Sequence, residues 1–296
     1  MSGLVHTWAA ARTPTRVVVM GSRGFVGQAI IAELAHHAIP YCPISSVEVD
    51  LLAPGAEEAL AGRLQPEDAF VIVSALTPDR GKDTATFMRN LRMMEAACAA
   101  LRRQPVAHVV NIGSDAVYPD DASLVDEATP AAPSGFHGMM HAAREVMLRA
   151  TVAAPVAFLR PSLLYGAADT HNGYGPNRFR RSALKEKQIS LFGGGEEKRD
   201  HVHVSDLAHI VRRVIERRSV GVLNVATGQS ATFRQVADHV AAQFASPIAI
   251  IEQPRSGGVV THRHFAVGAC LQAFPDFWAM PLADGIALAH REAAHG

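Results

Sequence analysis

The feature that most constrains this fold is a glycine-rich turn between a strand pattern and a helix pattern. The apolar run RVVVM (16–20) is typical of a buried strand, and residues 25–37 repeat apolar side chains at helical spacing. Between them, the spacing GxxGxxG places Gly21, Gly24 and Gly27. Backbone amides and the positive end of a helix dipole meet at such a turn, so it can hold an anion. The motif therefore predicts a bound dinucleotide pyrophosphate, the alternative being a tight turn without a ligand.

Strand and helix patterns alternate through the first half of the chain. Apolar runs typical of buried strands recur at 70–75, 107–114 and 156–161, and helical repeats at 83–103 and 137–150 separate them. Fully apolar strands that alternate with helices indicate a parallel sheet covered on both faces. We therefore expect an α/β fold with a doubly wound, parallel Rossmann sheet.

A change of character after Tyr165 indicates a smaller, C-terminal α/β domain that binds the substrate. Residues 166–181 are polar, rich in glycine and aperiodic, which is typical of a segment that builds a binding site. A helix pattern returns next, with Ser205 as its expected N-cap. The expected boundaries are 1–165 plus 206–228 for the Rossmann domain, and 166–205 plus 229–296 for the substrate domain.

Composition narrows the class of protein. Hydrophobic residues make up 48% of the 296 residues and charged residues 19%, an ordinary globular balance. Lys+Arg and Asp+Glu both total 28, so no net field favours nucleic acid or an anionic membrane. Three separated cysteines suit a reducing compartment, and we find neither a signal peptide nor a membrane-spanning run. We expect a cytoplasmic protein without nucleic-acid or membrane partners.

The residues near the glycine turn bear on which dinucleotide binds. An acid at the end of the second strand usually holds the free ribose of NAD. The run YCPISS ends with Ser45 and Ser46 and has no acid, whereas Arg23 could pair with a 2′-phosphate. The sequence therefore favours NADP over NAD, unless Arg23 is only a solvated loop residue. Asp50 and Leu51 are placed to contact an adenine, or form an ordinary turn.

Several further motifs follow one another along the chain. They are the glycine turn, Asp50-Leu51, Ser74-Ala75, Asn90, GSDAVY (113–118), LRPSLLYG (159–166), LFGGG with RDHVHVSD (191–206) and GVLNVATG (221–228). In this order they make the chain similar to the extended short-chain dehydrogenases/reductases, a family of nucleotide-sugar epimerases, dehydratases and reductases, and the resemblance covers about 16 to 290. It implies an NAD(P)-dependent enzyme acting on a nucleotide-diphosphate sugar, and a homodimer formed through 83–103 and 137–150.

The resemblance implies cofactor contacts along the first half of the chain. The glycine turn would hold the pyrophosphate, and the segment after residue 160 would meet the nicotinamide. The implied cofactor-binding residues are Gly21, Ser22, Arg23, Gly24, Phe25, Val26, Gly27, Ser45, Ser46, Asp50, Leu51, Ser74, Ala75, Leu76, Asn90, His141, Pro161 and Ser162.

Ser114, the last residue of the expected strand 107–114, and Asp115 after it match catalytic positions of the family. Ser114 matches the residue that hydrogen-bonds the reacting oxygen of the substrate, and it ends a strand, where open α/β sheets bind ligands. Asp115 matches an acid that helps protonate a leaving group in dehydratase-like members. It could equally cap a turn.

Four polar residues in the second half are implied as substrate contacts. Arg199 matches the arginine that grips the diphosphate of a nucleotide sugar, for which a planar guanidinium is suited. Asn177, Arg178 and Arg255 are further candidates for the same diphosphate. Arg178 could equally belong to a solvated basic face.

The helix after Ser114 departs from the family pattern. The family carries Tyr-x-x-x-Lys there, whereas this chain has His137 at the tyrosine position and His141 at the lysine position. An imidazole titrates near neutral pH without help from a lysine, so His137 could relay a proton to or from a sugar hydroxyl. His141 could still hydrogen-bond a cofactor ribose. We therefore expect a keto-sugar reductase or epimerase with a histidine acid/base.

Two alternatives to this histidine chemistry remain. The chain could be a catalytically silent protein that binds a dinucleotide and a nucleotide sugar. The spacing of His137 and His141 also suits zinc, but the HExxH glutamate is absent and only Asp115 offers a third ligand, so we expect no metal. We interpret the pair His201 and His203 as structural.

Overall fold

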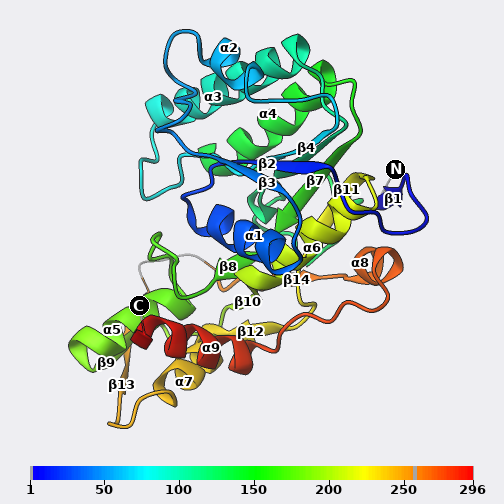
Figure 1. Cartoon of the computed structure of the whole chain (residues 1–296). Coiled ribbons are helices and arrows are strands. Elements are labelled where there is room, and N and C mark those ends of the chain that lie inside the picture. Colours follow the sequence, from blue (N-terminus) through cyan, green and yellow to red (C-terminus); the bar gives the residue numbers. More distant parts are fainter. Residues whose placement is uncertain (1–2, 256–258, 296) are drawn as a thin grey trace.

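A seven-stranded sheet with helices on both faces forms the larger part of the molecule (Figure 1). The computed structural model describes residues 3–255 and 259–295. The strand order of the large sheet is β1-β11-β7-β5-β4-β2-β3, and every pairing in it is parallel except that of β1 with β11. The strands are β1 (Leu4–His6), β2 (Arg16–Met20), β3 (Tyr41–Ile44), β4 (Asp68–Ile72), β5 (His108–Ile112), β7 (Val156–Pro161) and β11 (Ser219–Val225). The expected Rossmann sheet is confirmed.

Five helices cover the two faces of this sheet (Figure 1). One face carries α2, α3 and α4, and the other carries α1 and α6. The short 3-10 turn η1 (Asp115–Val117) follows β5. The helices are α1 (Phe25–His36), α2 (Ala56–Ala61), α3 (Thr84–Arg103), α4 (Phe136–Thr151) and α6 (Val204–Glu216).

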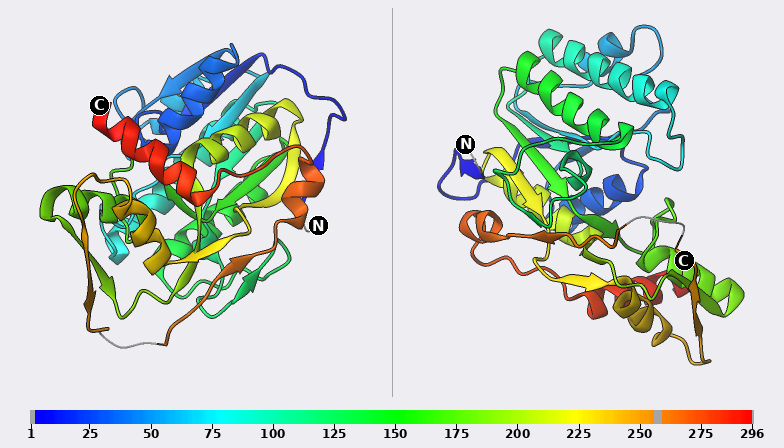
Figure 2. Two further views of the ribbon diagram at one scale, coloured as in Figure 1. Left: turned by 90° about the horizontal axis from the view of Figure 1, so that it is seen from below. Right: turned by 180° about the vertical axis from the view of Figure 1, so that it is seen from behind.

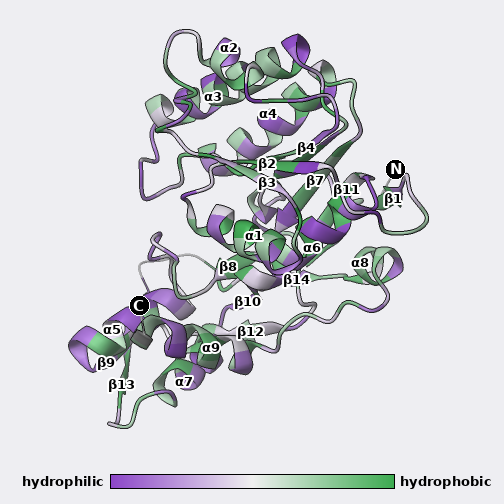
Figure 3. Ribbon diagram, viewed as in Figure 1, coloured by the Kyte–Doolittle hydropathy of each residue, from purple (hydrophilic) through white to green (hydrophobic). Residues whose placement is uncertain are grey.

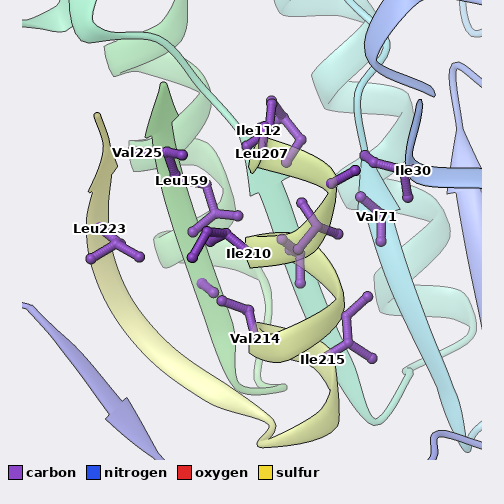
Figure 4. Packing of buried hydrophobic residues seen from close by; sticks show 14 of the residues in the cluster. Ile30, Val71, Ile112, Leu159, Leu207, Ile210, Val214, Ile215, Leu223 and Val225 are labelled. Atoms are coloured by element: carbon purple, nitrogen blue, oxygen red, sulfur yellow. The ribbon is translucent and has the colours of Figure 1, made fainter. Parts of the chain in front are cut away.

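The core between the sheet and α6 explains why these strands are apolar on one side, and the core beneath α2, α3 and α4 explains the other side. Ile210 and Val214 of α6 are fully buried against Leu159 and Leu223 of the sheet (Figure 4). Burial of a side chain of this size contributes about 1.5–3 kcal/mol. Figure 3 shows these hydrophobic strands enclosed by helices that carry hydrophilic residues as well.

The N-cap of α6 differs from the expected one. His203, rather than Ser205, caps the helix, and its Nδ1 lies 2.7 Å from the Ser205 hydroxyl. The first strand was not anticipated either. In β1, His6 Nδ1 lies 2.8 Å from the Ser219 hydroxyl and His6 Nε2 lies 2.9 Å from the carbonyl oxygen of Ala273. Three residues alone are too short to give a clear strand pattern.

A smaller α/β part packs below the carboxyl edge of the large sheet (Figure 2). Its core contains Tyr165, Phe179, Leu191, Phe233 and Ile286. The division into two domains at the expected boundaries stays a prediction. The remaining elements are β6 (Leu124–Val125), β8 (Leu163–Tyr165), α5 (Pro176–Glu186), β9 (Gln188–Phe192), β10 (Lys198–His203), β12 (Ser230–Thr232), α7 (Phe233–Ala241), β13 (Ala249–Gln253), β14 (His264–Phe265), α8 (Gly268–Ala273) and α9 (Leu282–His295).

The strand order of the large sheet contains a switch point at β2, where successive strands of the chain lie on opposite sides. From β2 the chain passes to β3 on one side, and then to β4 on the other. Ligands of open α/β sheets bind beyond the carboxyl ends of the strands at such a switch point. The glycine turn after β2 lies at this point. Among the helices of the described residues, none is both long and apolar enough to cross a membrane.

Candidate functional site

The glycine turn forms an open helix entrance. Gly24 is the N-cap of α1, and no side chain caps the first amides of the helix. Gly21 has a φ of +100°, which strongly favours glycine. A Cβ on Gly27 would overlap the carbonyl oxygen of Gly21. The turn therefore requires glycine for its own geometry and leaves the positive end of α1 open, which fits a pyrophosphate.

The end of β3 carries a carboxylate, contrary to the expectation from the sequence. Glu48 folds back, and its Oε2 accepts hydrogen bonds from the Ser45 amide (2.8 Å) and hydroxyl (2.5 Å). The bonds from Ser45 lower the pKa of Glu48, and the positive charge of Arg23 adds a smaller effect. Arg23 and Ser46 are exposed. This end of the strand thus carries an acid and a guanidinium together.

The two residues expected at the adenine have local roles. The Asp50 carboxylate accepts a hydrogen bond from the Leu52 amide at 3.0 Å and is exposed. Leu51 is buried in the core beneath α2 and α3. Only the backbone of Leu51 and the exposed carboxylate are therefore available to a nucleotide.

The loop after β4 is held in place from two helices. Asn90 of α3 accepts a hydrogen bond from the Leu76 amide (2.7 Å) and donates one to the Leu76 carbonyl oxygen (2.9 Å). Arg144 of α4 donates to the carbonyl oxygen of Ser74 at 2.8 Å. The Asn90 amide was expected to contact the cofactor, but both of its polar atoms are used by the loop. Asn90 therefore positions residues 74–76.

A cavity of about 280 Å³ lies beyond the carboxyl ends of β5 and β7, beside the glycine turn. A larger hollow of about 580 Å³ lies between the end of β11 and α9, and none of the expected site residues lines it. We take the smaller cavity as the candidate site because ten of the expected residues line it, against three that line another hollow of about 360 Å³ beside α3. The expected residues that line it are Phe25, Val26, Ala75, Ser114, Asp115, His137, His141, Pro161, Ser162 and Asn177.

Ser114 and Asp115 begin the turn η1 at the floor of the cavity. The Ser114 hydroxyl oxygen accepts a hydrogen bond from the Ala116 amide at 3.1 Å. Asp115 is buried, and one of its carboxylate oxygens lies 3.4 Å from a guanidinium nitrogen of Arg263. Burial raises the pKa of Asp115, although Arg263 opposes the shift. Asp115 is thus held by a partner 148 residues away, which sequence spacing could not reveal.

Tyr118, four residues after Ser114, is not among the residues that line the cavity. Its side chain is fully buried. The Tyr118 hydroxyl donates a hydrogen bond to Asn224 Oδ1 at 2.6 Å and accepts one from Arg160 at 3.0 Å. Arg160 in turn pairs with Glu145 of α4 through two hydrogen bonds of 2.8 and 2.7 Å. The tyrosine belongs to this buried network under α4.

The start of α4 brings both histidines to the cavity. A Cβ on Gly138 would overlap the carbonyl oxygen of Ala116, so glycine allows α4 to lie directly against η1. The rings of His137 and His141 meet edge to face, with centroids 4.7 Å apart. Burial lowers the pKa of His137 and lowers that of His141 well below its ordinary value. Both rings are therefore neutral at neutral pH.

The two histidines do not form a metal centre with a third residue. No group of three or more His, Cys, Asp or Glu residues able to hold a metal ion occurs within 3–255 and 259–295. Nδ1 of His141 is buried and has no hydrogen-bond partner among the residues described. A ligand hydroxyl could satisfy this nitrogen.

Arg144 is a functional candidate that the sequence did not reveal. It is 2% exposed, and no acidic partner pairs with it in the described part of the chain. Burial lowers the pKa of its guanidinium to about 10. It follows His141 by three residues and His137 by seven, so all three share one face of α4. An arginine on the buried face of a helix was the available signal.

Asn177 and His201 form the substrate-side wall of the cavity. Asn177 Nδ2 donates a hydrogen bond to Asp169 Oδ2 at 2.5 Å, and both residues line the cavity. His201 lines it too, although we expected a structural histidine. Its Nε2 is buried without a partner among the described residues, and burial lowers its pKa to about 4.

The three arginines expected at the diphosphate lie outside the residues that line the cavity. Arg199 donates hydrogen bonds to the carbonyl oxygen and hydroxyl of Thr261, each 2.8 Å long. Arg255 pairs with Glu196 at 2.8 Å. Arg178 is exposed, and its guanidinium lies 5.8 Å from the centre of the Tyr174 ring. Arg199 and Arg255 already have partners, so a diphosphate would have to compete for them.

Comparisons with known proteins agree with this fold. The chain is 23% identical to a dTDP-L-rhamnose 4-epimerase of Burkholderia thailandensis, over 83% of this chain and 86% of the relative. It is 27% identical to a dTDP-glucose 4,6-dehydratase of Mycolicibacterium smegmatis, over 70% of each chain.

Solved structures share the fold at lower identity. A GDP-L-fucose synthetase of Naegleria fowleri superposes with a TM-score of 0.82 at 14% identity, covering 100% of this chain and 96% of that one. A UDP-glucose 4-epimerase of Thermus thermophilus, in complex with NAD, gives 0.77 at 20% identity, covering 95% and 99%. The model of the NAD-dependent epimerase/dehydratase family matches residues 17–226. The chain belongs to this NAD-dependent epimerase/dehydratase family.

Proposed function

We propose that this protein is an NAD(P)-dependent enzyme that reduces or epimerises a keto-sugar of a nucleotide-diphosphate sugar. One observation gives this proposal its main support. His137 lines one cavity together with Ser114, Pro161 and Ser162, where the family places its reacting groups. The related epimerase and dehydratase both act on nucleotide sugars by name, which supports the substrate class.

Each residue has a defined role in this proposal. A bound nicotinamide would supply or accept a hydride. Ser114 donates a hydrogen bond to the reacting sugar oxygen, because its hydroxyl hydrogen is engaged only in a long bond of 3.5 Å to Asp115 Oδ1. His137 accepts the proton of a sugar hydroxyl, and burial keeps the ring neutral and ready to do so. His141 Nδ1 accepts a hydrogen bond from a cofactor ribose.

We further propose that the cofactor is NADP, with Arg23 pairing with the 2′-phosphate. The exposed guanidinium supports this preference, and the carboxylate of Glu48 opposes it. Titration of intrinsic fluorescence with NADPH and NADH tests the assignment. Arg23→Ala should weaken NADPH binding and leave NADH binding unchanged, whereas Glu48→Gln should strengthen NADPH binding. Equal loss of both cofactors in Arg23→Ala would contradict it.

We also propose that the chain forms a homodimer through α3 and α4. Large hydrophobic side chains on these helices are exposed, among them Met88 (42%) and Val146 (65%). Sedimentation at two protein concentrations measures the assembly state, and Val146→Glu should shift it to the monomer.

A panel of 4-keto nucleotide sugars with NADPH and NADH tests the activity itself. We expect the absorbance of the reduced cofactor to fall, and His137→Phe to slow this by about 100-fold, as removal of an acid/base group does. Tyr118→Phe is the control, because the Tyr118 hydroxyl is enclosed by Asn224 and Arg160 and should leave the rate unchanged. Consumption that persists in His137→Phe would remove the histidine from the mechanism.

The second candidate is a silent binder, favoured by the deep burial of His141 in place of the family lysine. In that case both cofactor and nucleotide sugar bind in a calorimeter, and no cofactor is consumed.

A further inference from the structure

Two loops meet at the mouth of the cavity through an acid and a histidine. Asp79 lies in the loop after β4, and His171 lies in the segment between β8 and α5, 92 residues later. His171 Nδ1 is 2.8 Å from Asp79 Oδ1. The Thr77 hydroxyl donates to the same carboxylate oxygen at 2.6 Å, and the His171 amide donates to Asp169 at 2.9 Å. The ring is thus held from both loops.

This contact determines which ring nitrogen of His171 is available. A carboxylate only accepts hydrogen bonds, so Nδ1 must carry the hydrogen that faces Asp79. Nε2 then remains as a proton acceptor, and no hydrogen bond within the described residues uses it. The pairing of an acid with Nδ1 is the arrangement by which proteins orient a histidine for proton transfer at Nε2.

His171 reaches both the cavity and the solvent. It lines the same cavity as His137, and its side chain is 40% exposed. His137 is more enclosed, and the positive charge of His171 is the second cause, after burial, that lowers its pKa. The two rings are therefore within electrostatic reach of each other.

Reduction of a keto-sugar makes a proton route necessary. Each carbonyl that gains a hydride also gains one proton on its oxygen, and that proton must come from solvent. We propose that His171, positioned by Asp79 and Thr77, relays protons between solvent and His137. This inference rests on the proposed function.

The proton balance of the relay is complete. Nε2 of His171 first takes a proton from water or a buffer acid and passes it to the free ring nitrogen of His137, and the resulting His137 imidazolium then gives one proton to the carbonyl oxygen, so that both rings return to their neutral forms. Oxidation of a sugar hydroxyl runs the same transfers backwards. The electron pair of each broken N–H bond stays on the nitrogen, so no further reactant is needed.

The test compares His171→Gln with His209→Gln in the full chain. His209 is a matched control, because it is 45% exposed and pairs with an acid, Glu33, at 3.1 Å on α6 away from the cavity. We measure kcat and KM for the keto nucleotide sugar with NADPH, in dilute buffer and with added imidazole. His171→Gln should lose about 100-fold in kcat, keep its KM and recover with imidazole, while His209→Gln stays at the wild-type rate. Asp79→Asn should lose about tenfold, because Nδ1 loses a charged acceptor.

Other outcomes overturn the relay. If His171→Gln loses activity that imidazole does not restore, or if this variant changes only KM, then the contact between Asp79 and His171 only holds the two loops together and relays no proton. If the wild type turns over and His171→Gln equals it, the relay alone is wrong. If the wild type consumes cofactor with no keto-sugar, the proposed function fails and the relay fails with it.

A second measurement does not depend on turnover. Ring nitrogen NMR spectra at pH 8 should show His171 with its hydrogen on Nδ1. In His171→Gln, the titration midpoint of His137 should move upward, because a neighbouring positive charge is lost. A hydrogen on Nε2 of His171, or an unchanged midpoint for His137, would contradict the geometry on which the relay depends.

Discussion

The two sides of the cavity achieve their geometry by different means. The proposed cofactor side, residues 21–27 and 74–76, is shaped by backbone contacts that only glycine permits and by Asn90, whose amide holds the loop. The proposed proton-transfer side, Ser114 with His137 and His141 of α4, is shaped by side chains on a helix that buried ion pairs hold in place. Backbone geometry tolerates little change, whereas side chains on a supported helix can be exchanged. This difference would allow the proposed exchange of the family's Tyr and Lys for His137 and His141 while the glycine turn is kept.

The largest expected effect is a difference in stability between variants of the two buried arginines, Arg160 under α4 and Arg144 beside the loop after β4. Arg160→Met breaks the pair with Glu145 under α4 and should destabilise the protein by about 3–5 kcal/mol, because the buried carboxylate is left with only the half-exposed Arg149 at 3.1 Å. Arg144→Met removes a buried cation that has no acidic partner among the described residues, and should change stability by less than about 1 kcal/mol. Urea unfolding measures both. Equal losses would mean that Arg144 has a charge partner in solution.

The next prediction addresses the cofactor side. Gly27→Ala places a methyl group against the carbonyl oxygen of Gly21 and should cost about 1–3 kcal/mol, with at least tenfold weaker binding of NADPH. Gly24→Ala is the control, since its Cβ would lie 3.4 Å from Gly21 O, in ordinary contact. Thermal unfolding and fluorescence titration measure the two effects. Intact binding in Gly27→Ala would show that the turn adjusts more readily than backbone contacts allow.

A smaller effect is expected where α4 meets η1. Gly138→Ala should cost about 1–2 kcal/mol, because its methyl group would collide with Ala116 and push α4 away. It should also lower kcat, since His137 moves with the helix. Gly135→Ala, three residues earlier, meets nothing within 4 Å and should stay within about 0.5 kcal/mol. If the two variants behave alike, the proton-transfer side does not depend on this close approach.

The effect that is smallest at neutral pH is a dependence of stability on pH that comes from His201 on the substrate-side wall of the cavity. Burial lowers the pKa of His201 to about 4, from an ordinary value of 6.5. The stabilisation from its neutral ring is therefore complete above pH 6.5 and is lost as the pH falls toward 4, by up to about 1.4 kcal/mol per pH unit. His201→Asn, which keeps a donor for the Arg199 carbonyl oxygen, should flatten the loss measured by urea unfolding between pH 7 and 5. An unchanged slope would show that His201 is hydrated.

The cofactor side could be predicted from the sequence because its signals are local. The spacing of Gly21, Gly24 and Gly27, and the apolar strands around them, indicated both the sheet and the turn. Contacts between distant residues could not be predicted. Asp115 with Arg263 and Asp79 with His171 join loops whose approach depends on the whole fold. Glu48 was missed for a different reason, because it lies beyond the strand end and folds back through a turn.

The pairing of β1 with β11 has a practical consequence for handling the protein. Residues 4–6 cover the outer edge of the large sheet, and His6 joins that edge to α8. A shortened version that begins after residue 8 would expose the backbone of β11, and a bare strand edge recruits other chains. An affinity tag is therefore better separated from Leu4 by a spacer than fused directly to it. Preparations that aggregate should first be checked for proteolysis of the N-terminal residues.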